Sequence, residues 1–195
     1  MKNLIETLDF RKEEKIQKLT MFVSICSFIR NMLNDAHERA SFANSNLNKE
    51  LEDTFKRHCV CEVEGSEYIC EHIIEVWTNA ALNVEFCEKM CQISLPVFLE
   101  KVFSTGKYED LKEKIIGLVA RLCKFKGIIS KVAECTNMHR CCVTAIMSKN
   151  TKIVPNAIRV LSYEYDVVSN VFLFEIEQFC KSVSSLLTEL CVKKD

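Results

Sequence analysis

The side chains best able to do chemistry gather in one stretch, HCVCEVEGSEYICEH, which runs from residue 58 to residue 72. Thiolate and imidazole groups are the usual ligands of structural zinc, and four of them can surround the ion tetrahedrally. The candidate ligands are His58, Cys59, Cys61, Cys70 and His72. Their spacing is loose and includes no C-x2-C pair, and cysteine is also a small, readily buried hydrophobe. The stretch therefore favours helix packing over a metal, and we expect no cofactor; a zinc-stabilised helical protein is the alternative.

Familiar catalytic patterns are missing from the sequence. It contains no glycine-rich phosphate loop, no G-x-S-x-G and no H-E-x-x-H. Cys87, Cys91 and Cys123 lie in apolar stripes, where burial raises a thiol pKa and leaves the sulfur unreactive. We therefore expect a protein that is not an enzyme and has no small-molecule substrate.

The composition indicates a helical protein of the cytoplasm or nucleus. A hydrophobic content of 48% beside 27% charged residues is typical of a packed chain, and 4 Gly and 2 Pro are too few for a strand-and-turn architecture. The charged N-terminus is no secretory signal, and no apolar run reaches the ~18 residues of a membrane span. The 12 cysteines are then reduced; a trimmed secreted protein with disulfides is the alternative.

A hydrophobic pattern at helical spacing recurs along the chain with a period of about 42 residues. The first copy has Ile73, Ile74, Trp77, Ala80 and Ala81, and the second has Ile115, Ile116, Val119, Leu122 and Cys123. Downstream, Phe86, Met90 and Cys91 correspond to Ile128, Val132 and Ala133. A third copy begins with Ala157, Ile158 and Leu161. The pattern predicts one structural unit repeated three times.

Each unit is expected to contain a long helix, a helix of one or two turns and another long helix, with STGKYED and MSKNTKIVP as connectors. Such a unit cannot bury its apolar face alone, so neighbouring units must stack. We place the units at about residues 68–109, 110–152 and 153–191, within a repeat region of residues 67–195. Residues 1–66 form an N-terminal helical cap or degenerate repeat, in which Asn31 takes the place of Ile73; an unrelated helical hairpin is the alternative.

The stretch TNAALNVEFCEKMCQISLPVFLEKVF resembles the armadillo repeat. It is similar to an armadillo third helix ending in NLA, a short loop, a first helix and the G-A-L-P-x-L-V opening of a second helix, with Ser94 in the glycine place. The resemblance covers about residues 68–190 and departs at CTNMHRC in the second unit, which has neither Gly nor Pro. It implies an all-α, armadillo-like α-solenoid, a right-handed superhelix of about three repeats with an N-terminal helical cap.

The resemblance also implies a binding site on the concave surface, which the third helix of each unit lines. In family members that grip extended peptides, this helix carries a Trp and, four residues on, an Asn. Matching TNAA to the family motif predicts a groove of Glu75, Asn79, Arg121, Arg159 and Tyr163, with Gly117 in a Trp place. Of the Asn and Trp positions that the family motif defines, one holds an Asn and none holds a Trp. The residues therefore argue against a nuclear-import receptor and favour a partner of mixed or acidic character. A merely solvated face is the alternative.

The sequence thus predicts a non-enzymatic interaction module, an adaptor or scaffold for a protein or peptide partner. An oligomer formed through an exposed terminal repeat is compatible with this organisation. A formal net charge of -1 provides no basic excess, which disfavours nucleic acid as the partner. The alternative fold and function is a compact Bcl-2-like bundle that captures an amphipathic helix in one hydrophobic groove.

Overall fold

The protein is helical throughout the part that the structure describes, which confirms the all-α prediction. This structure is a computed structural model, and it describes residues 12–59, 65–92, 99, 102–103, 109–135, 138–147, 150–168, 181, 184 and 188. These residues form no strand and nine helices: α2 (Lys12–Met32), α3 (Ala36–Ala43), α4 (Asn46–His58), α5 (Ser66–Ala80), α6 (Val84–Gln92), α8 (Glu109–Leu122), α9 (Lys126–Cys135), α10 (Met138–Met147) and α11 (Val154–Val168). In the same ranges, no helix combines the length and apolar character needed to cross a membrane.

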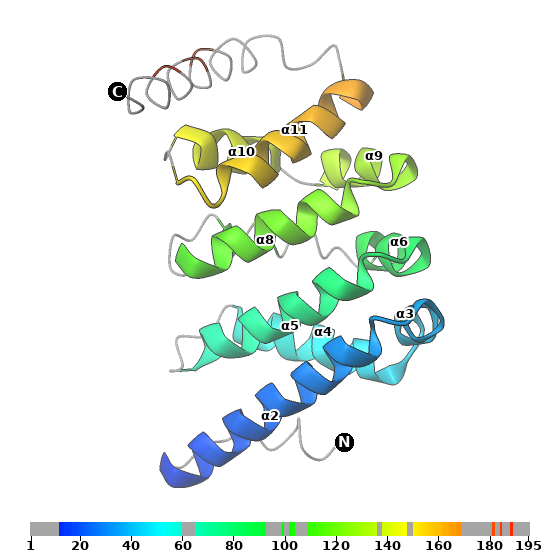
Figure 1. Ribbon diagram of the computed structural model, residues 1–195, viewed down its shortest axis with the longest axis vertical. Helices are drawn as coiled ribbons and strands as arrows, with labels where there is room; N and C mark the ends of the chain where they lie inside the picture. The colour runs from blue at the N-terminus through cyan, green and yellow to red at the C-terminus, as the bar shows by residue number, and fades with distance from the viewer. Residues whose placement is uncertain are drawn as a thin grey trace.

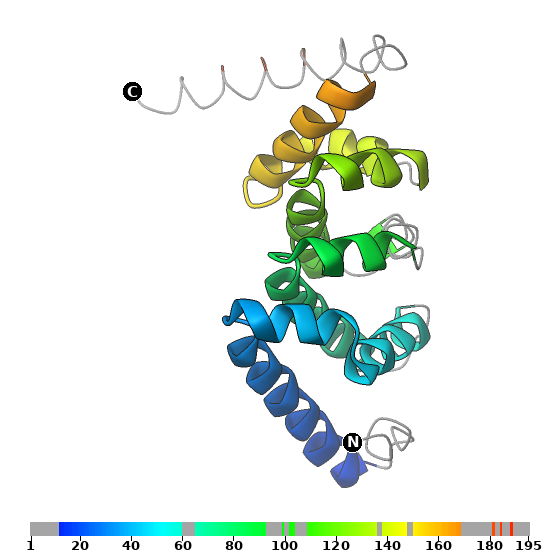
Figure 2. The same cartoon turned by 90° about the vertical axis from the view of Figure 1, so that its right-hand side faces the viewer.

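The helices are stacked along the longest axis of the molecule. Four long helices, α2, α5, α8 and α11, lie side by side, and each contacts the next (Figure 1). The short helices α3, α6 and α9 form a second column, in which α3 contacts α6 and α6 contacts α9. Helix α4 packs against α5, and α10 packs against α11. Figure 2 shows the same stack from the side, with successive groups of helices one above another.

Side-chain caps close the turns between a long helix and the short helix that follows it. Asp35 precedes α3 and accepts hydrogen bonds from the backbone N–H of His37 at 2.7 Å and of Glu38 at 3.3 Å. Asn83 precedes α6, and its Oδ1 accepts from the N–H of Phe86 at 2.9 Å. Such an oxygen satisfies an N–H group that has no partner inside the helix. The chain can therefore reverse within a few residues of each long helix.

The predicted repeat of 42 positions agrees with the burial pattern of α5 and α8. All ten matched positions are buried. The first five are Ile73, Ile74, Trp77 and Ala80 of α5 and Ala81, which follows it; the second five are Ile115, Ile116, Val119 and Leu122 of α8 and Cys123, which follows it. In the following short helices, Phe86, Met90, Ile128 and Val132 are buried as well. The sequence pattern therefore identified the core-facing side of these helices.

The number of positions between equivalent residues of the first and second units is 48, and not the expected 42. The buried positions of α2 match those of α5 at an offset of 48: Cys26 with Ile74, Ile29 with Trp77 and Leu33 with Ala81. Asn31 therefore takes the place of Asn79 and not that of Ile73. The buried residues Leu51 and Leu99 also differ by 48 positions. The extra residues consequently lie in the connection between α4 and α5.

Trp77 lies at the centre of the contact between α4 and α5. Its side chain is fully buried, and its ring meets that of Phe55 edge-on with 5.1 Å between centroids. The indole Nε1–H donates to Asn48 Oδ1 at 3.1 Å, and Asn48 Nδ2 donates to Met90 Sδ at 3.8 Å. A buried indole N–H needs such an acceptor. Asn48 thus ties α4 to both α5 and α6.

Some predicted features lie outside the described residues. They are the SLPVFL opening before Leu99, the first part of the CTNMHRC corner around residues 136–137, and most of residues 169–191 of the third unit. The last predicted unit, residues 153–191, is described as a continuous segment only as far as the end of α11.

Candidate functional site: a groove across the long helices

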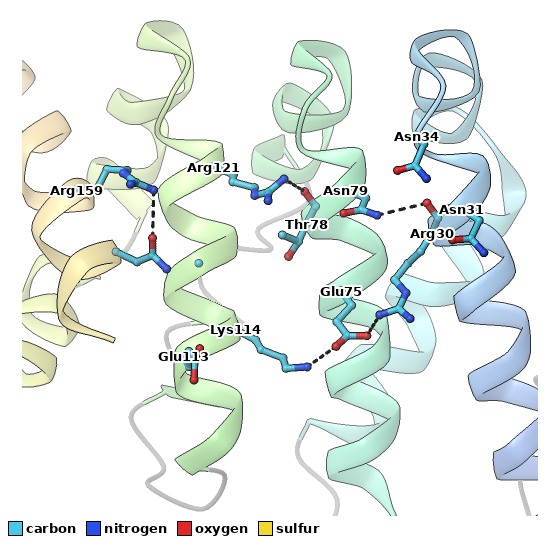
Figure 3. Close-up of a pocket in the computed structure, with 12 residues that line it drawn as sticks. Arg30, Asn31, Asn34, Glu75, Thr78, Asn79, Glu113, Lys114, Arg121 and Arg159 are labelled. Carbon is cyan, nitrogen blue, oxygen red and sulfur yellow. Dashed lines mark hydrogen bonds and ion pairs between the residues drawn. The ribbon is translucent and has the colours of Figure 1, made fainter. Parts of the chain in front are cut away.

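A groove of about 590 Å³ crosses the four long helices (Figure 3). Its lining is polar and charged, and comes from α2, its C-terminal turn, α5, α8 and α11: Arg30, Asn31, Asn34, Glu75, Thr78, Asn79, Glu113, Lys114, Gly117, Arg121, Asn156 and Arg159. Four of these side chains are basic and two are carboxylates. Each of the four long helices that the structure describes therefore contributes to the groove.

Glu75 links three consecutive long helices. Its carboxylate pairs with Arg30 of α2 and with Lys114 of α8, which approach it from opposite sides (Figure 3). It also lies 3.2 Å from Nδ1 of His72 on its own helix. Lys114 Nζ contacts Glu71 Oε1 at 2.6 Å. This cluster, which we call the Glu75 cluster, connects neighbouring units through charged groups that are only partly exposed to water.

The cluster shifts the pKa values of its own members. Burial raises the pKa of Glu75, but the hydrogen bond and charge of Lys114 and the charge of Arg30 outweigh burial and hold the pKa below its ordinary 4.5. Burial lowers the pKa of Lys114, but its bonds to Glu71 and Glu75 outweigh burial and hold that pKa above its ordinary 10.5. Both groups are therefore charged at neutral pH, and side chains of the same chain already offset the charge of Glu75.

A second contact repeats from one long helix to the next. Asn79 Nδ2 on α5 donates to the carbonyl oxygen of Arg30 in α2 at 3.3 Å. Arg121 Nη1, at the equivalent place on α8, donates to the carbonyl oxygen of Thr78 in α5 at 3.1 Å. The two acceptors are themselves equivalent, because they lie 48 positions apart. Each donor thus satisfies a carbonyl near the C-terminal end of the preceding helix, where carbonyls lack intrahelical partners (Figure 3).

The groove donors have more hydrogen-bonding capacity than these contacts use. A guanidinium carries five N–H donors, and an amide carries two. Arg121 uses one of them on a carbonyl oxygen, and Arg159 directs Nη1 to Oδ1 of Asn156 at 3.3 Å. Neither of these two contacts involves a carboxylate. The part of the groove that α8 and α11 line has one carboxylate, Glu113, beside these two guanidinium groups, so it can attract an anionic group.

The structure brings four of the five predicted groove residues together. Glu75, Asn79, Arg121 and Arg159 all line the groove. Tyr163 differs from the prediction, because it is absent from the lining and its half-buried side chain packs against the hydrophobic core. An aromatic ring at this position gains apolar contact that a groove position would not offer.

Sequence reasoning missed the contribution of α2, which supplies Arg30 and Asn31. A usable signal was present: Asn31, Asn79 and Arg121 each lie five residues before the start of the next short helix. Counting back from each turn, instead of forward with a fixed period, places Asn31 in the groove. Lys114 offers no comparable signal, because its role depends on where α5 places Glu75.

The His and Cys stretch is dispersed in the structure. Burial lowers the pKa of His58, with a smaller effect from a neighbouring arginine, and its Nδ1 lies 3.1 Å from the hydroxyl of the serine that begins α5. His72 belongs to the Glu75 cluster, and Cys59 and Cys70 are buried in the core. Cys61 lies outside the described residues. Within the part of the chain that the structure covers, no three His, Cys, Asp or Glu side chains come together as metal ligands.

The cysteine side chains that the structure describes are buried. Burial raises the pKa of Cys26 to about 12, and it does the same for Cys87, with a further contribution from Cys91. A thiol with such a pKa is protonated at neutral pH and is a poor nucleophile.

Comparisons with known proteins return no match: no protein-family model, no curated protein and no solved structure matches the chain. The geometry of the groove is therefore the basis for assigning a function.

Proposed function

We propose that this protein is a non-enzymatic interaction module, an armadillo-like helical array whose concave groove binds an extended segment of a partner protein. The observation that carries this proposal is a groove that crosses four consecutive long helices and receives polar side chains from each. A ligand that contacts all four helices must itself be long. An extended polypeptide meets this requirement, and its backbone carbonyls are acceptors for the amide and guanidinium donors.

The order and contacts of the helices support the array. The chain passes repeatedly from a long helix to a short helix across a tight turn, and the equivalent helices form two columns (Figure 1). The long helices contact one another in sequence order. These features are typical of a repeat protein, in which each unit contacts its neighbours. A compact Bcl-2-like bundle would instead offer one hydrophobic groove, whereas the lining of this groove is polar and charged.

The charges in the groove favour an acidic or mixed segment. The Glu75 carboxylate is offset by Arg30 and Lys114, so it contributes little net repulsion to an anionic ligand. Arg121 and Arg159 contact a carbonyl and an amide oxygen, which leave their positive charges in place. Guanidinium groups pair well with carboxylates, often through two parallel hydrogen bonds. We therefore assign the acidic side chains of the partner to the region between α8 and α11.

The proposal can be tested by selecting ligands from a random peptide library and measuring their affinity by fluorescence anisotropy. We expect the selected peptides to be rich in Asp and Glu. The double substitution Arg121→Glu with Arg159→Glu should weaken their binding by at least about tenfold, which corresponds to about 1.4 kcal/mol. Asn79 is left unchanged because the test concerns the positive charges of the groove, and the amide of Asn79 is neutral.

The matched control is Lys124→Glu with Lys126→Glu. Both lysines are exposed and lie outside the groove lining, so the net charge changes by the same amount. We expect this control to retain most of its affinity, and both variants to keep the wild-type circular dichroism spectrum. An equal loss in the two variants would show that net charge, and not the groove, controls binding. A library that yields no ligand would contradict the proposal altogether.

A further inference from the structure

The outer flank of α2 carries an apolar stripe that is largely exposed. We call Met21, Ile25, Phe28 and Met32 the α2 stripe. Met21, Phe28 and Met32 are 48%, 64% and 41% exposed, and Ile25 is partly buried against the core. Arg30 is the only charged residue between positions 20 and 34, and it pairs with Glu75 in the groove. The stripe is thus an uncharged, apolar surface at one end of the stack.

The equivalent stripe is buried in the following long helices. The matching residues are Ile69, Ile73, Val76 and Ala80 in α5, and Leu111, Ile115, Leu118 and Leu122 in α8, all of them buried. Three earlier helices, α2, α3 and α4, contact α5. The α2 stripe therefore continues the surface through which units pack against one another.

We propose that a second copy of this chain covers the α2 stripe, through antiparallel pairing of the two α2 helices about a twofold axis. The spacing between stripe residues is four, three and four positions, which is the heptad spacing of a helix-pairing seam. A twofold interface places the same patch on both sides, so the patch must be complementary to itself. An apolar stripe without charges meets this condition, because no like charges are brought together.

The antiparallel register follows from the stripe itself. Met21 lies opposite Met32 of the second copy, and Ile25 lies opposite its Phe28. Lys18, which precedes the stripe, and Asp35 of the second copy, which follows the end of its α2, then lie at the same end of the seam and have opposite charges. Arg30 faces the groove, as its pairing with Glu75 shows, so the dimer leaves the groove accessible. The dimer proposal is therefore independent of the peptide-binding proposal.

The seam is short, and the dimer is accordingly weak. Two heptads bury less surface than the roughly 1,200 Å² at the lower limit of stable interfaces. We expect a dissociation constant on the order of 10–100 µM, in the range of transient complexes. Sedimentation velocity in reducing buffer, over protein concentrations on both sides of this range, should show a monomer that converts to a dimer and no larger species.

Phe28→Glu tests the location of the interface. Phe28 is mostly exposed, so the substitution should leave the melting temperature of dilute protein unchanged while raising the dissociation constant at least about tenfold. The matched control is Ile16→Glu, which places the same charge at a 68% exposed apolar residue of α2 outside the stripe. This control should dimerise like the wild type.

A mixing experiment identifies the occupant as a second copy. Phe28→Lys should also be monomeric alone, and an equimolar mixture of the Phe28→Glu and Phe28→Lys variants should recover the dimer. A wild-type protein that stays monomeric at every concentration would overturn the proposal, as would Ile16→Glu dissociating the dimer as strongly as Phe28→Glu. Open-ended growth into larger species would overturn the twofold arrangement and indicate head-to-tail stacking. None of these results would affect the peptide selection that tests the groove.

Discussion

Replacing Glu75 by Gln should weaken the connection between three long helices without changing the shape of the side chain. In the wild type, the Glu75 carboxylate pairs with Arg30 on one side and with Lys114 on the other. Gln keeps an oxygen acceptor and loses the negative charge. Lys114 still has Glu71 at 2.6 Å, so the larger loss falls on the contact with Arg30.

The expected cost follows from the degree of burial of the cluster. Hydrogen bonds to charged groups contribute about 1.5–3 kcal/mol in buried sites, whereas exposed ion pairs contribute about 0–1 kcal/mol. The side chains of Glu75, Arg30 and Lys114 are between these limits, because they are 23%, 32% and 30% exposed. We therefore expect Glu75→Gln to lower the free energy of unfolding by about 1–2 kcal/mol. For a chain of this length, the melting temperature should fall by about 2–8 °C.

Urea denaturation of both proteins at several pH values provides the assay. The pKa of Glu75 is lower in the folded protein than its ordinary value of 4.5, so the ionised carboxylate stabilises the fold at neutral pH. This contribution is complete above the ordinary pKa and disappears as the pH falls through the folded-state pKa. The stability difference between wild type and Glu75→Gln should therefore be largest near pH 7 and should shrink steadily below pH ~4.5.

Glu113→Gln is the matched control, because Glu113 also lines the groove and does not belong to the Glu75 cluster. We expect it to change the free energy of unfolding by less than about 0.5 kcal/mol. The reasoning would be refuted by equal losses in the two variants, or by a difference for Glu75→Gln that stays constant from pH 7 to pH 3.

Three further predictions concern residues outside the cluster. Asn48→Leu should lower the free energy of unfolding by about 1–3 kcal/mol in urea denaturation, because it leaves the buried indole N–H of Trp77 without an acceptor. Its cost and that of Trp77→Phe should not add in the double variant; strict additivity would contradict the hydrogen bond between the two residues. Gly117→Ala should raise the free energy of unfolding by about 0.5–1 kcal/mol, and with it the melting temperature, because Ala favours the helix more than Gly does. The added Cβ has room, since it would lie 3.5 Å from its nearest neighbour. A lowered melting temperature would show that α8 and α11 pack too tightly for a methyl group. Asp35→Ala should lower the melting temperature through loss of the cap of α3, and Asp35→Asn should restore most of that loss; an unchanged melting temperature for Asp35→Ala would show that the cap contributes no stability.

The sequence was informative wherever the relevant quantity is the direction of a side chain on one helix. Residues that recur at three and four positions occupy one face of a helix whatever its surroundings. The stripe of Ile73, Ile74 and Trp77 therefore predicted the core face of α5, and its repetition predicted that of α8. Asn79 and Arg121, which were assigned to the groove from the resemblance to the armadillo motif, lie 42 positions apart on successive helices, and both line the groove.

The length of the first unit could not be predicted from the periodic pattern. The pattern measures positions within a helix, whereas the offset between units depends on the length of the connection between them. The longer connection between α4 and α5 raises the offset from 42 to 48 and moves Asn31 into line with Asn79. A search for repeats with one fixed period does not detect such an insertion. Aligning the units at the tight turn after each long helix would still match Asn31 with Asn79.

By itself, then, the sequence determined the helical class, the buried face of the central helices and most of the polar residues that point toward one groove. The helical class and the buried face follow from local periodicity and from the preference of apolar side chains for the interior, whereas the groove residues were predicted from the resemblance to the armadillo repeat. Only the tertiary structure decided which polar groups of the groove are engaged: Glu75 with Arg30 and Lys114, and Asn79 with a carbonyl of α2. Those contacts depend on how far each helix is rotated and shifted relative to its neighbours. Rotation and shift are set jointly by packing between units, so no single segment of the sequence contains them.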